Sequence, residues 1–309
     1  MITSEQLPMS GAEPVEEASL ARPDRGWRDH FAPLLANKLA LLGGVVTLFC
    51  FVVAAIGLVI MAFPSFHHLY LDQDVNSALI KPFKPHHLLG TDNFGRDMAW
   101  RVAAGTGISL GIGIVVTAAS MSLGLILGAV AGYFRGPADR IISAFIDLTW
   151  GFPLVLVAVI FVGMLKPGIP AVILGVSVVN WAGFARIIRA QVLSLRERAF
   201  VEAARSLGVP AWKIILRHLV PNTVGTSLVM ASYYVAVTVI AEAGLSFIGL
   251  GAQPPTPSLG QMIATGRNYL YNDPWAAIIP GVAIALIVLG LNTLGDGLRD
   301  IFDPRLRQW

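Results

Sequence analysis

Charged side chains are scarce in this sequence, and their scarcity excludes most soluble folds. Of the 309 residues only 13% are Asp, Glu, Lys or Arg, whereas 55% are hydrophobic and the mean hydropathy is +0.68. Soluble globular proteins carry about 25% charged residues. Because a chain of this composition belongs in a lipid bilayer, we predict an integral membrane protein.

Cysteine is almost absent, since Cys50 is the only one and lies in an apolar run. An intrachain disulfide is therefore impossible. The six histidines include two adjacent pairs in one loop, without cysteine and without helical spacing, so we predict no metal site. The formal net charge of +3 gives no support to nucleic-acid binding.

Catalytic and nucleotide-binding motifs are missing as well. None of the five lysines follows a glycine, so the sequence contains no G-x-x-x-x-G-K-[ST] phosphate loop. It also lacks H-E-x-x-H and clustered carboxylates. We therefore predict that the chain is no enzyme and holds no cofactor of its own.

Long apolar runs are the main feature that is present. A helix needs about 20 apolar residues to cross a hydrocarbon core of about 30 Å. Six runs meet this length and predict an all-α membrane fold with six transmembrane helices, at about 39–63, 106–134, 141–165, 169–188, 223–250 and 275–294. Pro153 predicts a kink within the third.

Small residues recur every fourth position in the second predicted span. Gly124, Gly128 and Gly132 follow this spacing, and Gly107 and Gly111 repeat it. Small residues at this spacing let helix backbones approach closely in lipid. We therefore expect this span to be an inner helix of the bundle.

The spans divide the chain into four stretches. We predict a disordered cytoplasmic segment over 1–30, a first helix with a long loop over 31–104, a five-helix core over 105–296 and a cytoplasmic tail over 297–309. Lysine and arginine accumulate on the cytoplasmic side of a membrane protein. With the termini inside, 16 of the 22 lie in inner segments and 6 in outer ones, which predicts cytoplasmic termini.

The longest polar interruption of the C-terminal half, over about 194–222, predicts two short helices. The first is predicted over Glu202 to Leu207, and Gly208 ends it because glycine tolerates the left-handed conformation. Pro210 suits the first turn of the second helix, and Pro221 is expected to end that helix. An apolar stripe at helical spacing is expected to pack toward the membrane helices: Trp212, Ile215, Leu216 and Leu219.

This interruption has two interpretations. It is either an ordinary cytoplasmic linker or a docking element for another protein. Arg205, Lys213 and Arg217 form its basic face. Because the chain has no energy source of its own, docking onto a motor subunit is the favoured interpretation.

Two carboxylates fall at membrane depth, Asp147 and Glu242. Intramembrane carboxylates are costly and usually face a bundle interior or water. They either line a solute path, with Tyr233 and Tyr234 as further candidates, or are hydrogen-bonded packing residues. The sequence leaves both interpretations open.

The outer loop carries a compact charge cluster, Asp92, Arg96 and Asp97. These residues either contact an external protein or brace the loop. Opposite charges this close in sequence usually satisfy each other or solvent. Bracing is therefore favoured.

Several stretches resemble one family. Glu202-Ala-Ala, Gly208 and residues 219–222, Leu-Val-Pro-Asn, resemble the EAA loop of ATP-binding-cassette (ABC) importer permeases. Residues 89–97, Leu-Gly-Thr-Asp-Asn-Phe-Gly-Arg-Asp, resemble a signature of the dipeptide/oligopeptide/nickel permease family, and 243–257 and 292–305 resemble its C-terminal half. The resemblance spans about 27–307 and is to the second, C-type permease subunit.

The resemblance implies the type I importer fold in a bacterial inner membrane. It also implies a homologous second permease subunit, two ATPase subunits that bind ATP and Mg, and an extracytoplasmic substrate-binding protein. The EAA loop of the family couples to the ATPase. Glu202, Ala203, Ala204 and Gly208 match that motif, and spacing adds Arg205 and Lys213 to the predicted coupling site.

The resemblance further implies that the permease forms half of a path for peptides or peptide-like solutes. The motifs concern coupling and scaffold, so another solute, such as a nickel chelate, glutathione or an opine, is an alternative. An ion-coupled carrier is a more distant one, because a proton relay would need several ionisable groups in register.

Overall fold

The computed structural model describes residues 38–302. The predictions for 1–30 and for 303–309 lie outside this range. Within it the secondary structure is helical, with two isolated bridges and no strand. The longer helices are α2 (Lys38–Ala62), α4 (Met98–Phe134), α5 (Gly136–Trp150), α6 (Leu154–Leu165), α7 (Ile169–Leu195), α8 (Ala199–Ser206), α10 (Val220–Phe247), α11 (Leu259–Gly266) and α12 (Trp275–Phe302). Shorter elements are η1 (Pro64–Phe66), α3 (His68–Leu71), η2 (Val75–Ser77), α9 (Ala211–Ile214), η3 (Ile215–Leu219) and η4 (Arg267–Tyr269).

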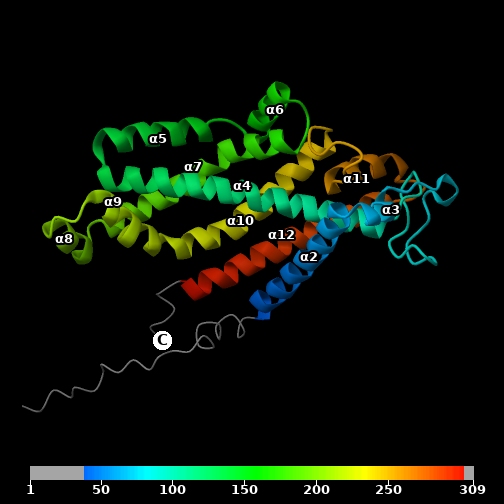
Figure 1. Ribbon diagram of the computed structural model, residues 1–309, viewed down its shortest axis with the longest axis horizontal. Coiled ribbons are helices and arrows are strands. Elements are labelled where there is room, and N and C mark those ends of the chain that lie inside the picture. Colours follow the sequence, from blue (N-terminus) through cyan, green and yellow to red (C-terminus); the bar gives the residue numbers. More distant parts are fainter. Residues whose placement is uncertain (1–37, 303–309) are drawn as a thin grey trace, which may run out of the picture.

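The described helices form an elongated bundle in which α4 runs through the middle (Figure 1). The short helices α8 and α9 lie at one end of its long axis, which we call the hairpin end. The loop that contains α3, together with α11, lies at the opposite end, which we call the loop end. Five helical runs are long and apolar enough to cross a membrane, and there are six if the bent pair α5 and α6 is one span. The all-α, six-span prediction is confirmed with that pair counted as the third span.

The third span is not the single kinked helix that the sequence predicted. Its two halves, α5 and α6, meet at an angle of 89°. Gly151 ends α5, where its N–H bonds to Asp147 O at 3.0 Å. Pro153 is extended, with ψ 130°, and precedes α6. A residue before proline disfavours the α conformation, so Phe152 cannot continue the helix and the span breaks.

The prediction that Pro221 ends the hairpin helix is also wrong. A continuous helical run extends from Ala211 to Phe247 and contains α9, η3 and α10. The segment η3 is π-helical, and the Val220 N–H bonds to Ile215 O, one residue further back than in an α-helix. Pro221 therefore lies just after the π turn, and the helical run continues through it into α10.

The glycine spacing in α4 is a packing motif, as the sequence predicted. A Cβ on Gly128 would lie 2.6 Å from Ala185 O, and one on Gly132 would lie 2.8 Å from Arg189 O. Both oxygens belong to α7, so α4 and α7 touch backbone to backbone. Gly107 approaches α2 instead, whereas a Cβ on Gly111 would meet nothing within 4 Å. The second glycine pair is therefore not a packing motif of this chain.

Candidate functional site

The hairpin end is built around a helix cap at Gly208. Gly208 has φ +74°, the left-handed conformation that glycine adopts without steric cost. Its N–H bonds to Arg205 O at 3.0 Å, and the Val209 N–H bonds to Ala204 O at 3.1 Å. These two bonds are those of a Schellman motif. The predicted end of the first helix at Gly208 is confirmed, and the chain direction after α8 is defined by backbone hydrogen bonds.

One face of α8 is anchored to the bundle. Val201 is fully buried and Ala204 is 9% exposed. They pack in one apolar cluster with Tyr133 of α4, Ile188 of α7 and Ile214 of α9. The hairpin is therefore continuous with the membrane helices.

The opposite face of α8 is exposed. Glu202, Ala203 and Gly208 all lie on this surface, and Leu207 beside them is 83% exposed. The motif residues thus alternate between anchoring the hairpin, as Ala204 does, and forming its outer surface.

The predicted apolar stripe of the second helix divides into two faces. Ile215 and Leu219 are buried, as expected, but Trp212 and Leu216 are 64% and 61% exposed. The prediction that all four pack toward the membrane helices is wrong. The π turn shifts the angular positions of residues along this segment, so a regular α-helical period does not describe it. The exposed pair borders a surface depression of about 420 Å³, which is lined by Trp212, Lys213, Leu216, Arg217 and Pro221.

Arg205 faces its own chain. Its guanidinium lies 5.6 Å from the centroid of the Tyr133 ring, and that of Arg196 lies 5.9 Å from the same centroid. Cation–π contacts at such distances contribute about 0.5–1 kcal/mol at exposed sites. Of the predicted basic face, Lys213 and Arg217 border the depression, and Arg205 secures α8 to α4.

Asp147 lies on an exposed surface of α5. Its side chain is 72% exposed and forms an ion pair of 2.8 Å with Arg186 of α7. The same guanidinium lies 4.4 Å from the centroid of the Trp150 ring. These contacts tie the exposed side of α5 to α7.

Glu242 is fully buried in α10 and is surrounded by hydroxyl groups. Ser109 of α4 donates to Oε2 at 2.6 Å, while Ser246 and Ser258 donate to Oε1 at 2.6 and 3.0 Å. The three serines are themselves at most 2% exposed. The carboxylate therefore joins α4, α10 and the segment before α11.

The two tyrosines of α10 have different environments. Tyr233 is 57% exposed. Tyr234 is half-buried, and its ring centroid lies 4.6 Å from that of Phe184 in α7. Its hydroxyl occupies the space where a side chain on Gly183 would be. Asp147, Glu242 and the tyrosine pair thus make their described contacts in separate places.

Comparison with known proteins shows which family the chain belongs to. Residues 124–308 match the family described as the binding-protein-dependent transport system inner membrane component. The chain belongs to this family. The matched range contains the whole hairpin and the α4–α7 packing motif. This inner-membrane component is thus a permease of the ABC importer class.

Individual relatives agree with the family. The permease is 35% identical to the dipeptide transport system permease protein DppC of Alkalihalophilus pseudofirmus, over 91% of this chain and 90% of the relative. It is 37% identical to the glutathione transport system permease protein GsiD of Pectobacterium atrosepticum, over 95% of both chains. A solved structure of the MetNI methionine ABC transporter matches with TM-score 0.55 at 20% identity, covering 66% of this chain and 97% of that one. At this identity the match shows the fold alone.

Sequence reasoning on this permease missed several polar contacts between distant segments. Arg189 of α7 forms a two-point ion pair with Asp139 of α5, with one bond of 2.9 Å. The three serines around Glu242 were also missed. Their signal would have been a buried carboxylate that needs donors. Ser246 lies four residues after Glu242 on the same helix, but Ser109 and Ser258 lie in other segments. A cleft at the loop end, described below, was missed for the same reason.

Proposed function

We propose that this permease is one of two transmembrane subunits of an importer for small peptides or glutathione-like peptides, and that its hairpin couples it to an ATPase. The observation that carries the coupling is the capped hairpin. It presents Glu202, Ala203 and Leu207 outward while Val201 and Ala204 anchor it to the bundle. Energy for uptake must come from a partner, because the sequence contains no phosphate loop.

The hairpin end is cytoplasmic in this proposal. The Lys and Arg residues support this orientation, since 16 of 22 then lie in inner segments. The loop end is then extracytoplasmic, where a substrate-binding protein delivers the solute. Two ATPase subunits and a homologous permease complete the proposed complex.

The packing indicates how a movement of the hairpin would reach the path. Val201 packs in one apolar cluster with residues of α4 and α7, and α9 continues through η3 into α10. Well-packed apolar clusters transmit displacement because they are nearly incompressible. An ATPase that pulls or tilts α8 would therefore move the inner ends of α4, α7 and α10 together.

The four predicted path residues receive different roles in this proposal. Glu242 is an anchor, because three hydroxyls satisfy its carboxylate. Asp147 holds α5 against α7 through Arg186. Tyr234 packs the α7–α10 contact, and Tyr233, whose ring is exposed, is the residue of the four that lines the path.

The substrate class rests on the relatives. Transporters of dipeptides and of glutathione both carry permeases with at least 35% identity to this chain over nine-tenths of its length. Their shared chemistry is a short peptide with free charged ends. We therefore propose short peptides as the solute.

Charge reversal at the hairpin tests the proposal. Glu202→Lys is expected to abolish peptide uptake and co-purification of the ATPase, while the permease stays folded in the membrane. Glu197→Lys, in the link two residues before α8, is the matched control. It makes the same charge reversal at a residue whose ion pair with Arg135 is exposed and therefore contributes little to stability. If both variants retain wild-type uptake and ATPase binding, the coupling proposal is wrong.

A further inference from the structure

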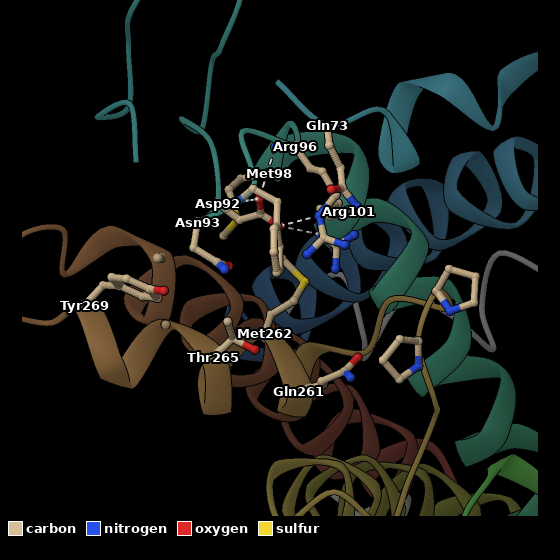
Figure 2. Close-up of a pocket in the computed structure, with 15 residues that line it drawn as sticks. Gln73, Asp92, Asn93, Arg96, Met98, Arg101, Gln261, Met262, Thr265 and Tyr269 are labelled. Atoms are coloured by element: carbon tan, nitrogen blue, oxygen red, sulfur yellow. Dashed lines mark hydrogen bonds and ion pairs between the residues drawn. The ribbon is translucent and has the colours of Figure 1, made fainter. Parts of the chain in front are cut away.

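A polar cleft of about 510 Å³ opens at the loop end of the bundle. One wall comes from the loop before α4 and the start of that helix, and the other from α11 and η4. Figure 2 shows Asp92, Arg96 and Arg101 grouped on the first wall, with Gln261 and Thr265 on the second. The two walls are far apart in sequence, so the cleft exists only in the folded chain.

The charges in this cleft are unbalanced. Asp92 Oδ2 lies 2.7 Å from Arg96 Nε and 3.3 Å from Arg101 Nε, so two guanidinium groups share one carboxylate. These three are the ionised residues in the lining, which gives the cleft a net positive charge. Bracing of the loop, the interpretation favoured from sequence, is confirmed for Asp92. It leaves a cationic surplus that bracing does not explain.

The first wall is rigid. Asp92 accepts hydrogen bonds from the Phe94 N–H at 2.8 Å and the Arg96 N–H at 3.0 Å. Arg101 is 5% exposed, and its Nη1 donates to Tyr70 O at 3.2 Å. The cationic groups are therefore held in position before any partner arrives, which lowers the entropy cost of binding.

The second wall supplies neutral polar groups and is equally fixed. Gln261, Thr265 and Tyr269 line it. Its helix α11 approaches α10 so closely that a side chain on Gly260 would overlap the Ala243 carbonyl, and a Cβ on Gly266 would lie 2.6 Å from the backbone of Ala276. The cleft thus combines a cationic wall with a polar wall, and both are fixed to the bundle.

We propose that this cleft receives an acidic side chain of the substrate-binding protein. The inference rests on the proposed function, because it needs the loop end to face the extracytoplasmic side. The family is binding-protein-dependent, so a partner must dock on that side. A carboxylate is complementary to a cleft in which guanidinium groups outnumber carboxylates, and Arg pairs are favoured for carboxylate recognition. Electrostatic complementarity of this kind raises the association rate and fixes orientation.

The test places a negative charge on the second wall and leaves the Asp92 network intact. Gln261→Glu and Thr265→Glu are made in the complete transporter, reconstituted in lipid nanodiscs with its ATPase subunits. Asn272→Glu is the matched control, because it adds the same charge at an exposed residue outside the cleft. The probe is the substrate-binding protein of the same transport system, purified separately.

Like charges across an interface cost several kcal/mol, so each cleft variant is expected to bind the probe at least about tenfold more weakly than the control. Thr265→Lys is expected to bind it more tightly. Raising the salt concentration should weaken wild-type binding more than binding to the Glu variants. Basal ATP hydrolysis and ATPase co-purification should be unchanged in all of them.

Two results would overturn the inference. One is equal affinity of the cleft variants and the control for the binding protein. The other is that a free dipeptide binds the transporter in the absence of the binding protein and that the same Glu substitutions abolish this binding. The cleft would then be a site for the solute itself. In either case intact ATPase coupling would leave the proposed function standing, whereas loss of ATPase co-purification from the wild type would refute that function.

Discussion

Substitutions at Gly208 test whether the capped form of the hairpin is the form that docks. The backbone there has φ +74°, and a Cβ at this residue would meet no atom of the chain within 4 Å. Conformation, and not space, therefore determines which residues are tolerated. Asn adopts the left-handed conformation readily. For Ala this conformation costs about 1 kcal/mol, and for Val it costs more because the side chain is β-branched.

Proline at this position fails for two reasons. It fixes φ near −65°, and it removes the N–H that bonds to Arg205 O at 3.0 Å. Together these effects cost about 3 kcal/mol or more. The loss of ATPase affinity cannot exceed the cost of restoring the cap. Since about 1.4 kcal/mol is a factor of ten, Gly208→Ala should weaken binding by up to about fivefold and Gly208→Pro by as much as about 100-fold.

The assay measures the affinity of the purified ATPase for each variant in nanodiscs, with the melting temperature of the permease as the control for folding. Gly208→Asn is expected to bind within about twofold of the wild type, because Asn tolerates the required φ. Two outcomes would refute the reasoning. Equal affinities for Ala, Pro and Gly would mean that the cap is irrelevant to docking. An Asn variant as weak as the Pro variant would mean that the ATPase contacts the bare glycine surface.

Gly128→Ala is expected to lower the melting temperature, because overpacking against Ala185 O costs about 1–3 kcal/mol. Gly111→Ala is the control, since its Cβ would meet no atom within 4 Å, and it should leave the melting temperature unchanged or raise it. Equal effects of the two substitutions would contradict the packing of Gly128 against α7. Glu242→Gln should preserve both stability and peptide uptake, since an amide can still bond to the serines. Glu242→Leu should destabilise by several kcal/mol, because each orphaned hydroxyl costs about 1–3 kcal/mol, as thermal denaturation would show. A stable Gln variant without uptake would instead assign proton chemistry to Glu242.

The loop before α4 shows which features of the fold local sequence predicts and which it does not. Asp97 caps α4, where its side chain accepts from the Ala99 N–H at 2.8 Å, so the second span begins at Met98 and not near 106 as predicted from apolarity. A capping residue before an apolar run is a local signal that a hydropathy window does not register. By contrast, the ion pair between Asp92 in the loop and Arg101 in the first turn of α4 was visible only in the folded structure.

The sequence predicted some features of the candidate site and not others. The cap at Gly208 and the outward position of Glu202 follow from local chemistry, because a left-handed glycine and a short amphipathic helix need only neighbouring residues. The exposure of Trp212 and Leu216 did not follow, since it depends on a π turn that α-helical periodicity does not describe. Of the serine donors around Glu242, Ser246 lies four residues further along the same helix, but Ser109 and Ser258 come from other segments, so helical spacing carried no information about those two.

The sequence by itself determined that this chain lies in a membrane, that it spans the membrane as helices, and that its polar interruption forms a hairpin capped at Gly208. These conclusions depend on composition, run length and local backbone chemistry, each of which acts over neighbouring residues. Tertiary structure alone decided which apolar faces pack together, where the third span breaks, and that two distant segments form a cationic cleft. The physical reason is that lipid and protein interior are both apolar. Hydrophobicity therefore encodes the depth of a residue in the bilayer, and only the packed fold decides its neighbours.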